Sequence, residues 1–386
     1  MEAFVRTARK CPVEKGSESP CSKEIRNKKL HKEEMKRTIV AFDSVAGFYP
    51  LFNAWIKVSR GNGKDKRKDV IAYSEHADDN IRKLSDQLMS GTWRPDKGRT
   101  FMLFTEGKWR KIHVVNIETQ IVFQALVDAF QFTRLLTNRT FGSIKKRGTL
   151  KANKQVRRDL YRHPEYDYVI KTDFHHYYEM IIKAKLMEKV RHKYKGSAAI
   201  RLLECCIDAY LPGMERGISI GAVTSQGLGN FYLDEFDRFI MSELHCGCMA
   251  RNVDDTVILC RKEDGARLIP LLRKKAEDLG LTYSRIEFFP ISARRIDFCG
   301  WAVNHEGARV RTSTVRKYRR RLHQMQQHPE RINRTRSVVG SYEGILRHGD
   351  AYQLTNKIHK DYDEVFNRIN RHAAYQRRSK RTLAAA

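Results

Sequence analysis

Two adjacent aspartates, Asp254 and Asp255, interrupt an apolar run that extends from Val253 to Leu259. The β-branched and aliphatic residues of such a run predict a buried strand. Two unpaired carboxylates are costly to bury, and a neighbouring cation would offset that cost. Divalent metal ions are the usual cations at paired carboxylates. The competing interpretation is a tight turn between two strands with both carboxylates in water, and the pair alone favours the turn.

The chain is strongly basic. Its 386 residues include 74 Lys and Arg against 45 Asp and Glu, which gives a formal net charge of +29. This length allows two or three domains. The charge predicts a polyanionic partner, most commonly a nucleic acid. Basic residues are spread along the chain and are denser at both ends and near 311–336, which favours a long positively charged channel over a single basic tail.

Several classes of protein are disfavoured by the sequence. No apolar run approaches the ~20 residues that a membrane-spanning helix requires, and the charged segment from Met1 to Leu30 lacks the apolar core of a secretion signal. We therefore expect no membrane partner. The eight cysteines show no zinc-binding spacing, and we expect them to be reduced residues of a cytoplasmic protein.

A third carboxylate, Asp173, follows a predicted strand over 165–172. Two neighbouring strands would bring Asp173 close to Asp254. Three converging carboxylates suit a site with two divalent metal ions ~4 Å apart that transfers phosphoryl or nucleotidyl groups. Between these segments, small residues from Gly217 to Ser225 allow a backbone or a nucleotide to approach closely. For this loop alone, a glycine-rich cap of a helix is the better interpretation.

The hydrophobic pattern predicts an α+β chain, in which a central antiparallel sheet carries the aspartates and helices cover one face. Strands are predicted at 101–104, 111–115, 296–303 and 309–311, the first two joined by a hairpin at Glu106-Gly107. Helices are predicted at 81–88, 122–130, 186–190, 198–210 and 264–279. One long amphipathic helix is predicted over 226–244, and a basic helical region follows Ser313 with a break at Pro329.

In chain order, these segments resemble the motifs of bacterial reverse transcriptases, over roughly residues 70 to 360. The segment 169–178 resembles the first palm motif, 217–230 resembles the loop that positions template and nucleotide, and 251–255 resembles the catalytic hairpin. The segment 296–301 resembles the primer grip. Further likenesses, to fingers and thumb motifs, lie at Lys108–Ile112, Arg147-Gly148 and Ser341–His348.

The resemblance implies a right-hand polymerase fold, with fingers and palm built from an antiparallel sheet plus helices and with a basic helical thumb. The implied divisions are a polar, partly disordered extension at 1–38, fingers at 39–160, a catalytic palm at 161–310, a thumb at 311–370 and a basic tail at 371–386. The implied activity is RNA-directed DNA synthesis by nucleotidyl transfer with two Mg²⁺ ions, or with Mn²⁺ in their place.

The resemblance also implies roles for individual residues. Asp173 and Asp254 would be the main metal ligands, assisted by Asp255 and by the carbonyl of Phe174. Tyr178 would be a steric gate that excludes a 2′-hydroxyl, against the alternative of a core aromatic residue. The other implied contacts are to the incoming nucleotide (Lys108, Arg110, Ile220, Gly221 and Gln226), to the primer (Phe298, Cys299, Gly300 and Trp301) and to nucleic-acid phosphates (Arg147, Arg251, Arg311, Arg316, Arg319 and Arg320).

Two positions depart from the family pattern. Asn252 stands where the family usually has an aromatic residue, which predicts altered primer handling. Ile220 stands where many relatives have glutamine. The pattern from Ile220 to Gln226 resembles the reverse transcriptases of diversity-generating retroelements and related stand-alone enzymes, including some in phage defence. In the first group this substitution is associated with error-prone copying, which is our hypothesis here.

The implied partners are an RNA template, a DNA or RNA primer and deoxynucleoside triphosphates, with a dedicated structured RNA and a small accessory protein as further candidates. The implied location is the bacterial cytoplasm. Three alternatives stay open: a phage-defence reverse transcriptase that uses a dedicated non-coding RNA, a catalytically weak RNA-binding protein that retains the polymerase fold, and an RNA-copying polymerase that does not select deoxynucleotides. Asn252 favours the second alternative, and the presence of all three aspartates opposes it.

Overall fold

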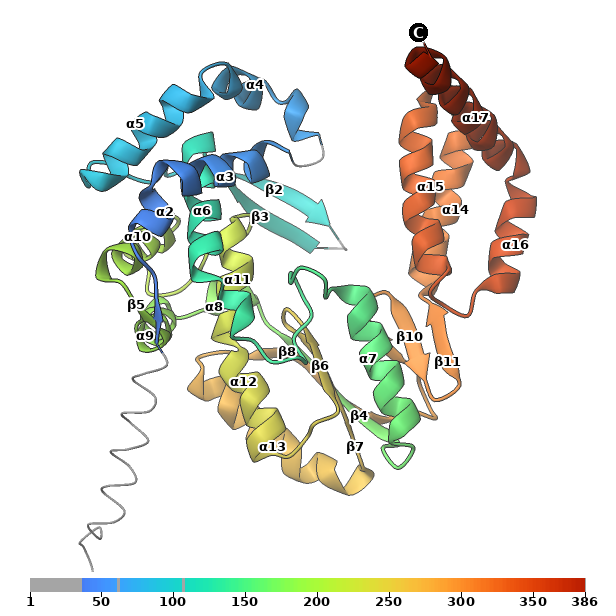
Figure 1. Cartoon of the computed structure of the whole chain (residues 1–386). Helices are drawn as coiled ribbons and strands as arrows, with labels where there is room; N and C mark the ends of the chain where they lie inside the picture. The colour runs from blue at the N-terminus through green and yellow to red at the C-terminus, as the bar shows by residue number, and fades with distance from the viewer. Residues whose placement is uncertain (1–36, 61–62, 106–107, 386) are drawn as a thin grey trace, which may run out of the picture.

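The computed structural model describes residues 37–60, 63–105 and 108–385, which form a mixture of helices and sheets (Figure 1). Nearly all of the expected extension at 1–38 lies outside the described residues, as does the expected turn at Glu106-Gly107. No helix in the described part of the chain is both long enough and apolar enough to cross a membrane.

A four-stranded antiparallel sheet lies at the centre, with the strand order β6–β7–β4–β8. Its strands are β4 (Tyr168–Phe174), β6 (Met249–Asn252), β7 (Asp255–Cys260) and β8 (Tyr283–Pro290). β6 and β7 form the hairpin that carries the aspartate pair, and β4 pairs with β7. The expectation that Asp173 and the pair belong to neighbouring strands is therefore confirmed.

Side chains alternate between the two faces of this sheet, and each face has its own core. Ile170 and Ile258 lie on the face that packs against helices, whereas Val169 and Val257 lie on the opposite face. The helices of the first face are α11 (Val223–Tyr232), α12 (Asp234–Arg238) and α13 (Lys262–Asp278). The second face packs against helix α7 (Thr149–Arg162) and a small sheet. The expectation of helices on one face only is thus wrong, because α7 covers part of the other (Figure 1).

The segment 296–303, which we expected to be one strand, is a hairpin. β9 (Ile296–Phe298) turns at Cys299-Gly300 into β10 (Trp301–Asn304), which also pairs with β11 (Gly307–Val310). Cys299 and Gly300 have φ angles of 51° and 96°. An apolar run conceals such a turn, because a cysteine rather than an asparagine or aspartate takes the left-handed position.

The expected hairpin near residue 106 is confirmed on both sides of its tip. β2 (Arg99–Thr105) and β3 (Lys108–Val114) pair in antiparallel register, with Leu103 opposite Arg110. Large apolar side chains along this hairpin are exposed, including Phe104 at 57% and Trp109 at 66%. The hairpin therefore extends from the body of the protein (Figure 1).

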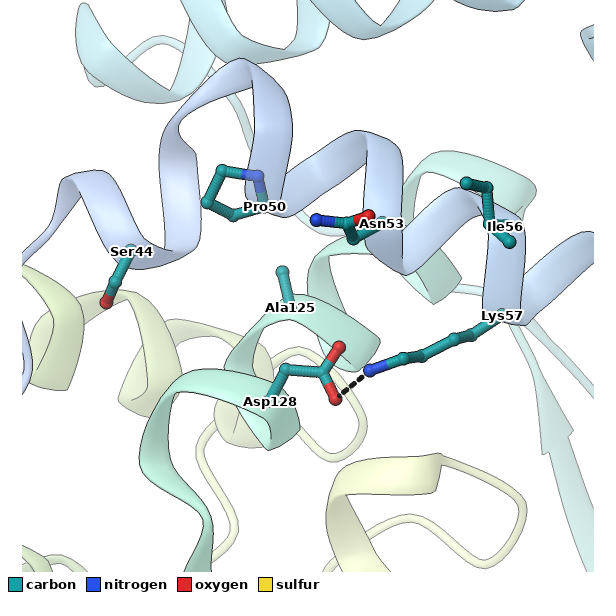
Figure 2. A pocket seen from close by; sticks show the side chains of 7 residues that line it. All are labelled: Ser44, Pro50, Asn53, Ile56, Lys57, Ala125 and Asp128. Atoms are coloured by element: carbon teal, nitrogen blue, oxygen red, sulfur yellow. Dashed lines mark ion pairs between the residues drawn. The ribbon is translucent and has the colours of Figure 1, made fainter.

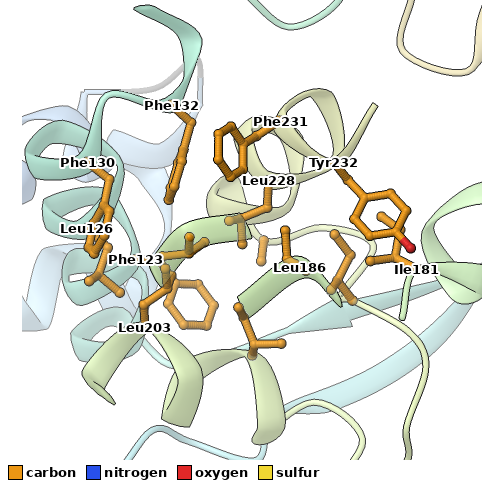
Figure 3. Packing of buried hydrophobic residues seen from close by; sticks show 14 of the residues in the cluster. Phe123, Leu126, Phe130, Phe132, Ile181, Leu186, Leu203, Leu228, Phe231 and Tyr232 are labelled. Carbon is orange, nitrogen blue, oxygen red and sulfur yellow. The ribbon is translucent and has the colours of Figure 1, made fainter. Parts of the chain in front are cut away.

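The N-terminal helices gather around α6 (Ile117–Phe130), which contacts helices on several sides. Figure 3 shows the core where α6 meets α11: Phe130 and Phe132 stack with centroids 5.1 Å apart, and Phe231 lies 5.5 Å from Phe132. The surrounding elements are β1 (Thr38–Ile39), α2 (Asp43–Ala46), α3 (Phe48–Ser59), α4 (Lys68–Glu75), α5 (Ala77–Met89), α9 (Lys183–Lys193), β5 (Tyr194–Lys195) and α10 (Ser197–Asp208).

The prediction of one long amphipathic helix over 226–244 is wrong in two respects. The helical stretch breaks at Leu233 between α11 and α12, and it continues as one wider turn over Phe239–Glu243. α11 is also buried on nearly every side. Gly229 permits this burial, because an added Cβ would lie 3.1 Å from the ring of Tyr178.

The C-terminal region is helical and basic, as expected, with a break near Pro329. Its helices pack around a separate core that includes Tyr318, Leu322, Ile358 and Val365. They are α14 (Thr312–Gln327), α15 (Ile332–Leu346), α16 (Tyr352–Asp361) and α17 (Asp363–Ala385). Figure 1 shows this bundle connected to the central sheet through β10 and β11.

Candidate functional site

The three aspartates meet at one end of the central sheet. Asp173 lies in β4 and Asp255 begins β7, one step beyond the paired residues Thr172 and Thr256. Antiparallel register therefore turns Asp173 and Asp255 toward the same face. Asp254 lies in the two-residue turn between β6 and β7. Both interpretations of the aspartate pair were partly correct: Asp254 occupies a turn, and Asp255 begins a strand.

The carboxylates repel one another in a desolvated environment. Burial raises the pKa of Asp255 to about 6; Lys171 opposes this shift, and the charges of Asp173 and Asp254 add to it. Burial also raises the pKa of Asp254, the charge of Asp173 raises it further, and Arg110 and Arg251 oppose the rise. The protein thus concentrates negative charge at this end of the sheet without neutralising it fully.

One oxygen of the site has no hydrogen-bond partner. Asp255 Oδ1 is buried and accepts no hydrogen bond, because Lys171 Nζ, at 3.6 Å, is too distant and donates instead to the carbonyl of Asp297. Asp173 Oδ2 accepts a hydrogen bond of 2.8 Å from Ser284 Oγ. A hard divalent cation with oxygen ligands fits this donor set, since it would satisfy the orphaned oxygen and offset the repulsion.

The ligands are not already arranged as a closed cage. No group of three or more His, Cys, Asp and Glu side chains in the described ranges 37–60, 63–105 and 108–385 stands ready to hold a metal ion. Electrostatic coupling among the aspartates and the lack of a ready cage are compatible, because the first acts over longer distances than metal bonds. The carboxylates would have to close around an ion when it binds.

Arg251 does not lie on a nucleic-acid surface, so that expectation is wrong. Its side chain is 0% exposed and forms a two-pronged ion pair with Asp237, which is also 0% exposed. Arg147 is half-buried, and its Nη1 donates to the carbonyls of Thr137 and Thr140 at 2.5 and 2.9 Å. Both arginines serve internal partners that the local sequence did not reveal.

Tyr178 lies between a core position and the carboxylates. It belongs to the short helix α8 (Tyr177–Met180), and its ring centroid is 5.3 Å from that of Tyr177. Burial raises the pKa of Tyr178 to about 12, and the charge of Asp254 contributes to the rise. The side chain is half-buried rather than enclosed. The influence of the Asp254 charge on Tyr178 is compatible with the gate, and the packing of its ring against Tyr177 also has core character.

The loop at Ile220 is fixed to the base of the β2–β3 hairpin. The carbonyl of Ile220 accepts a 2.9 Å hydrogen bond from the backbone N–H of His113, and Ser219 Oγ lies 3.0 Å from His113 Nδ1. Gly221 has a φ of 124°, and an added Cβ would lie 2.6 Å from the carbonyl oxygen of His113. Gln226 is exposed at the start of α11. His113, which sequence analysis missed, thus connects the loop to the hairpin.

Lys108 and Arg110 are two residues apart in β3, so their side chains lie on the same face of the strand, and both are exposed. Arg110 is close enough to Asp254 to lower the pKa of its carboxyl group. Lys111 points to the other face of the same strand. The charge of Arg110 therefore reaches Asp254, and Lys108 lies on the same face of β3 nearer the tip of the hairpin.

The expected primer contacts divide into two kinds. Phe298 and Trp301 are only 0% and 4% exposed, because they fill the core beneath β9 and β10. The prediction that these two side chains contact the primer directly is therefore wrong. The turn between them, Cys299-Gly300, is partly exposed and lies near Asp255, whose charge adds to the burial that raises the pKa of Cys299 to about 12.

The predicted phosphate-binding residues of the C-terminal region lie at and along α14. Arg316 and Arg320 are exposed one helical turn apart. Arg311 pairs with Asp297, and Arg319 lies 3.4 Å from Asp361. Arg316 and Arg320 therefore have the most accessible charge of these four arginines, while Arg311 and Arg319 also hold neighbouring segments.

A basic surface on α7 escaped sequence analysis. We define the α7 basic face as the exposed side chains of Lys151, Lys154, Arg158 and Arg162. Their spacing of three or four residues places them on one side of the helix. The one acidic residue of α7, Asp159, is buried and pairs with Arg139 at 2.5 Å. The recurrence of Lys and Arg every three or four residues in this segment could have predicted the α7 basic face from the sequence.

One hollow in the N-terminal helices does not belong to the carboxylate site. It measures ≈ 330 Å³ and lies between α3 and α6, where Lys57 Nζ and Asp128 Oδ1 form a 2.7 Å ion pair (Figure 2). Its lining includes the apolar Pro50, Ile56 and Ala125. None of the residues expected to act in catalysis lines this hollow, so it is separate from the carboxylates at the sheet end.

Comparison with known proteins finds no established relative by sequence. No protein-family model matches the chain. No curated protein matches it either. Three similar solved structures are telomerases, each at low sequence identity. The apo telomerase of Candida tropicalis truncated from its C-terminal domain is 14% identical with a TM-score of 0.44, over 55% of this chain and 55% of that one.

Two further solved structures resemble the chain to a similar degree. The apo telomerase of Candida tropicalis is 13% identical with a TM-score of 0.40, over 54% of this chain and 46% of that one. The telomerase of Candida albicans in complex with the TWJ fragment of telomeric RNA is 11% identical with a TM-score of 0.41, over 70% of this chain and 59% of that one. The chain thus matches only about half the length of these structures, and so loose a likeness carries no conclusion about activity.

Proposed function

We propose that this protein is an RNA-directed DNA polymerase. The observation that carries the proposal is the set of three aspartates at one sheet end, with an orphaned carboxylate oxygen on Asp255 and with Arg110 nearby. Excess negative charge at the end of the sheet suits metal-assisted nucleotidyl transfer. The +29 net charge supports a nucleic-acid partner.

Asp173, Asp254 and Asp255 would hold Mg²⁺, or Mn²⁺ in its place. When bound, the ions would supply charge stabilisation for the attacking 3′-oxygen and for the leaving pyrophosphate. Arg110 and Lys108 would balance the charge of the incoming triphosphate, as cationic groups do in phosphoryl transfer. Their position on one face of β3 supports this role.

Tyr178 would select deoxynucleotides by excluding the 2′-hydroxyl. The half-buried ring lies near Asp254 and is backed by Tyr177 and Gly229, so it cannot retreat far. Tyr178→Ala should therefore improve incorporation of ribonucleotides relative to deoxynucleotides. Equal discrimination by both proteins would assign Tyr178 to the core alone.

An error-prone mode of copying is the finer proposal. Ile220 presents an apolar side chain at a loop that is fixed to His113 by a backbone hydrogen bond. The loop should therefore keep its place when Ile220 is replaced by glutamine, and only the side chain would change. Sequencing of cDNA made by wild type and by Ile220→Gln tests the idea, and an unchanged error spectrum would contradict it.

The RNA template and the primer would contact the exposed arginines of α14 and the α7 basic face, since phosphates are the natural partners of such cations. A dedicated structured RNA and a small accessory protein are further proposed partners. Diversification of a retroelement and phage defence both fit the same chemistry, and the bacterial cytoplasm suits either. Flanking genes distinguish them, because diversification requires a neighbouring repeat-bearing variable gene.

Primer extension tests the proposal. Wild type should extend oligo(dT) on poly(rA) with Mg²⁺ or Mn²⁺, and Asp254→Ala combined with Asp255→Ala should abolish extension while RNA binding persists. The control is Asp361→Ala, which removes an exposed carboxylate of α16 that lies 3.4 Å from Arg319. Extension that survives loss of both aspartates would refute the proposed site.

A non-catalytic RNA-binding protein is the second candidate. Asn252, which replaces an aromatic residue beside the turn, and the absence of a ready metal cage among the described residues favour it. This candidate predicts RNA binding that is insensitive to the aspartate substitutions, with no extension by wild type under any primer, template or metal condition.

A further inference from the structure

A buried cation supports the turn that carries Asp254. Arg251 is 0% exposed, and its Nε and Nη2 each donate to a carboxylate oxygen of Asp237 at 2.6 Å. Its Nη1 donates to Asn230 Oδ1 at 3.0 Å and to the carbonyl of Val253 at 2.6 Å. The guanidinium therefore joins α11 and α12 directly to the turn between β6 and β7.

The partners of this guanidinium are themselves fixed. Thr140 Oγ1 donates to Asp237 Oδ2 at 2.6 Å, and Asn230 Nδ2 donates to the carbonyl of Gly142 at 2.7 Å. The backbone of Arg251 also bonds on both sides to the segment 139–141. A satisfied buried network of this kind is rigid, because each group has lost its water and depends on the others.

The turn itself needs such support. Val253 has a φ of 63° at the position where a two-residue hairpin usually places glycine. A β-branched residue is strained there and keeps this conformation only when its surroundings impose it. Arg251 holds the Val253 carbonyl, and Gly142 packs against the residue so closely that an added Cβ would lie 2.6 Å from the Val253 nitrogen.

We propose that Arg251 is a positioning residue: by holding the Val253 carbonyl, it fixes the strained turn and thereby the place of the Asp254 carboxylate relative to Asp173. Its kinetic consequence rests on the proposed polymerase function. The contrary view is that the Arg251–Asp237 pair only stabilises the fold, as many buried ion pairs do.

Arg251→Lys is the central variant, because lysine keeps the charge for Asp237 but lacks the fork that also reaches Val253. Arg139→Lys is the matched control, since Arg139 Nη1 pairs with the buried Asp159 at 2.5 Å rather than with the turn. Thr140→Val is a milder second variant that removes one hydrogen bond from Asp237 and should fold even if Arg251→Lys does not.

For primer extension, Arg251→Lys should lower kcat about a hundredfold, since small displacements of reacting groups cost that much, with little change in the KM for nucleotide. Thr140→Val should lower kcat less, and Arg139→Lys should leave kcat unchanged. The rescue variant combines Arg251→Lys with Val253→Gly. Glycine accepts a positive φ without strain, so the turn then needs less support and kcat should recover at least tenfold.

A purely structural role predicts a different pattern. In that case both lysine variants lose activity only in proportion to their unfolded fraction at the assay temperature, and Val253→Gly rescues nothing. Either an unchanged kcat in folded Arg251→Lys and Thr140→Val or a failure of rescue would overturn the proposal.

Binding of Mn²⁺, followed by the electron paramagnetic resonance signal of the free ion, separates this inference from the proposed function. Weaker Mn²⁺ binding by Arg251→Lys but not by Arg139→Lys supports the positioning role even if wild type extends no primer. Conversely, primer extension and Mn²⁺ binding that are both unaffected by Arg251→Lys would leave the polymerase in place and refute the positioning role.

Discussion

Replacement of Asp255 by asparagine should stabilise the metal-free protein at neutral pH. Asp255 is 23% exposed at its side chain, and burial raises its pKa from the ordinary 3.8 to about 6. A carboxyl group with a raised pKa binds a proton more tightly in the folded protein, so its ionisation reduces stability as pH rises from 3.8 to 6. Above that range the full penalty persists, and asparagine removes it.

The size of the effect follows from the shift. About two pKa units, at ~1.4 kcal/mol each, correspond to about 3 kcal/mol at pH 7.5, falling to ~1 kcal/mol near pH 4.5, where the folded carboxyl is mostly protonated. For a chain of this size, 1 kcal/mol corresponds to roughly 2 °C in Tm. Asp255→Asn should therefore raise Tm by about 6 °C at pH 7.5 in EDTA.

The assay is thermal unfolding between pH 4.5 and 8 with EDTA or with millimolar Mg²⁺. Mg²⁺ should reverse the order, because an ion that binds only the folded carboxylates stabilises wild type more than Asp255→Asn. Asp297→Asn is the control, since its carboxylate is 58% exposed. An Asp255→Asn variant that is less stable than wild type at pH 7.5 in EDTA, or whose advantage grows toward pH 4.5, would refute the reasoning.

Three further predictions concern packing, nucleotide binding and RNA binding. Gly142→Ala should destabilise the folded protein by about 1–3 kcal/mol and lower kcat, because the added Cβ would lie 2.6 Å from Val253. Its control is Gly340→Ala in α15, where no atom lies within 4 Å of the added Cβ, and this change should stabilise the fold by about 0.5–1 kcal/mol. Thermal unfolding measures both effects. Arg110→Gln should raise the KM for nucleotide in steady-state primer extension, while Lys111→Gln, on the opposite face of β3, should not. Neutralising the α7 basic face with glutamine should flatten the dependence of log K for RNA on log salt by ~0.7–0.9 for each phosphate that the protein no longer neutralises, and an unchanged slope would exclude this surface.

Local patterns predicted the parts of the fold that depend on near neighbours. The hairpin that carries Asp254 and Asp255, the β2–β3 hairpin and the helix predicted at 81–88 follow from hydrophobic periodicity and turn residues. The sequence alone misplaced the boundaries of strands and helices where the residue types did not indicate a turn or a helix end. The turn at Cys299-Gly300 lies within an apolar run, and the break at Leu233 lies within a continuous helical pattern.

The composition and order of residues determined three properties of this protein: a strong positive charge, a pair of carboxylates at a strand end, and a third carboxylate on another strand. These properties need only pattern and period, since alternation along a strand fixes which side chains share a face. The structure, and not the sequence, placed Lys108 and Arg110 on one face of a strand, because β3 begins at Lys108 and the predicted strand began only at residue 111.

Only the tertiary structure decided which basic residues face inward. Arg251 and the exposed Arg316 look alike in the sequence, but Asp237 and Asn230, brought beside Arg251 by folding, supply the acceptors that make its burial tolerable. A guanidinium can leave water only where such partners already stand. The sequence therefore revealed the aspartate pair itself. Only the fold revealed that Arg251 holds the turn of this pair, because the partners of Arg251 come together only on folding.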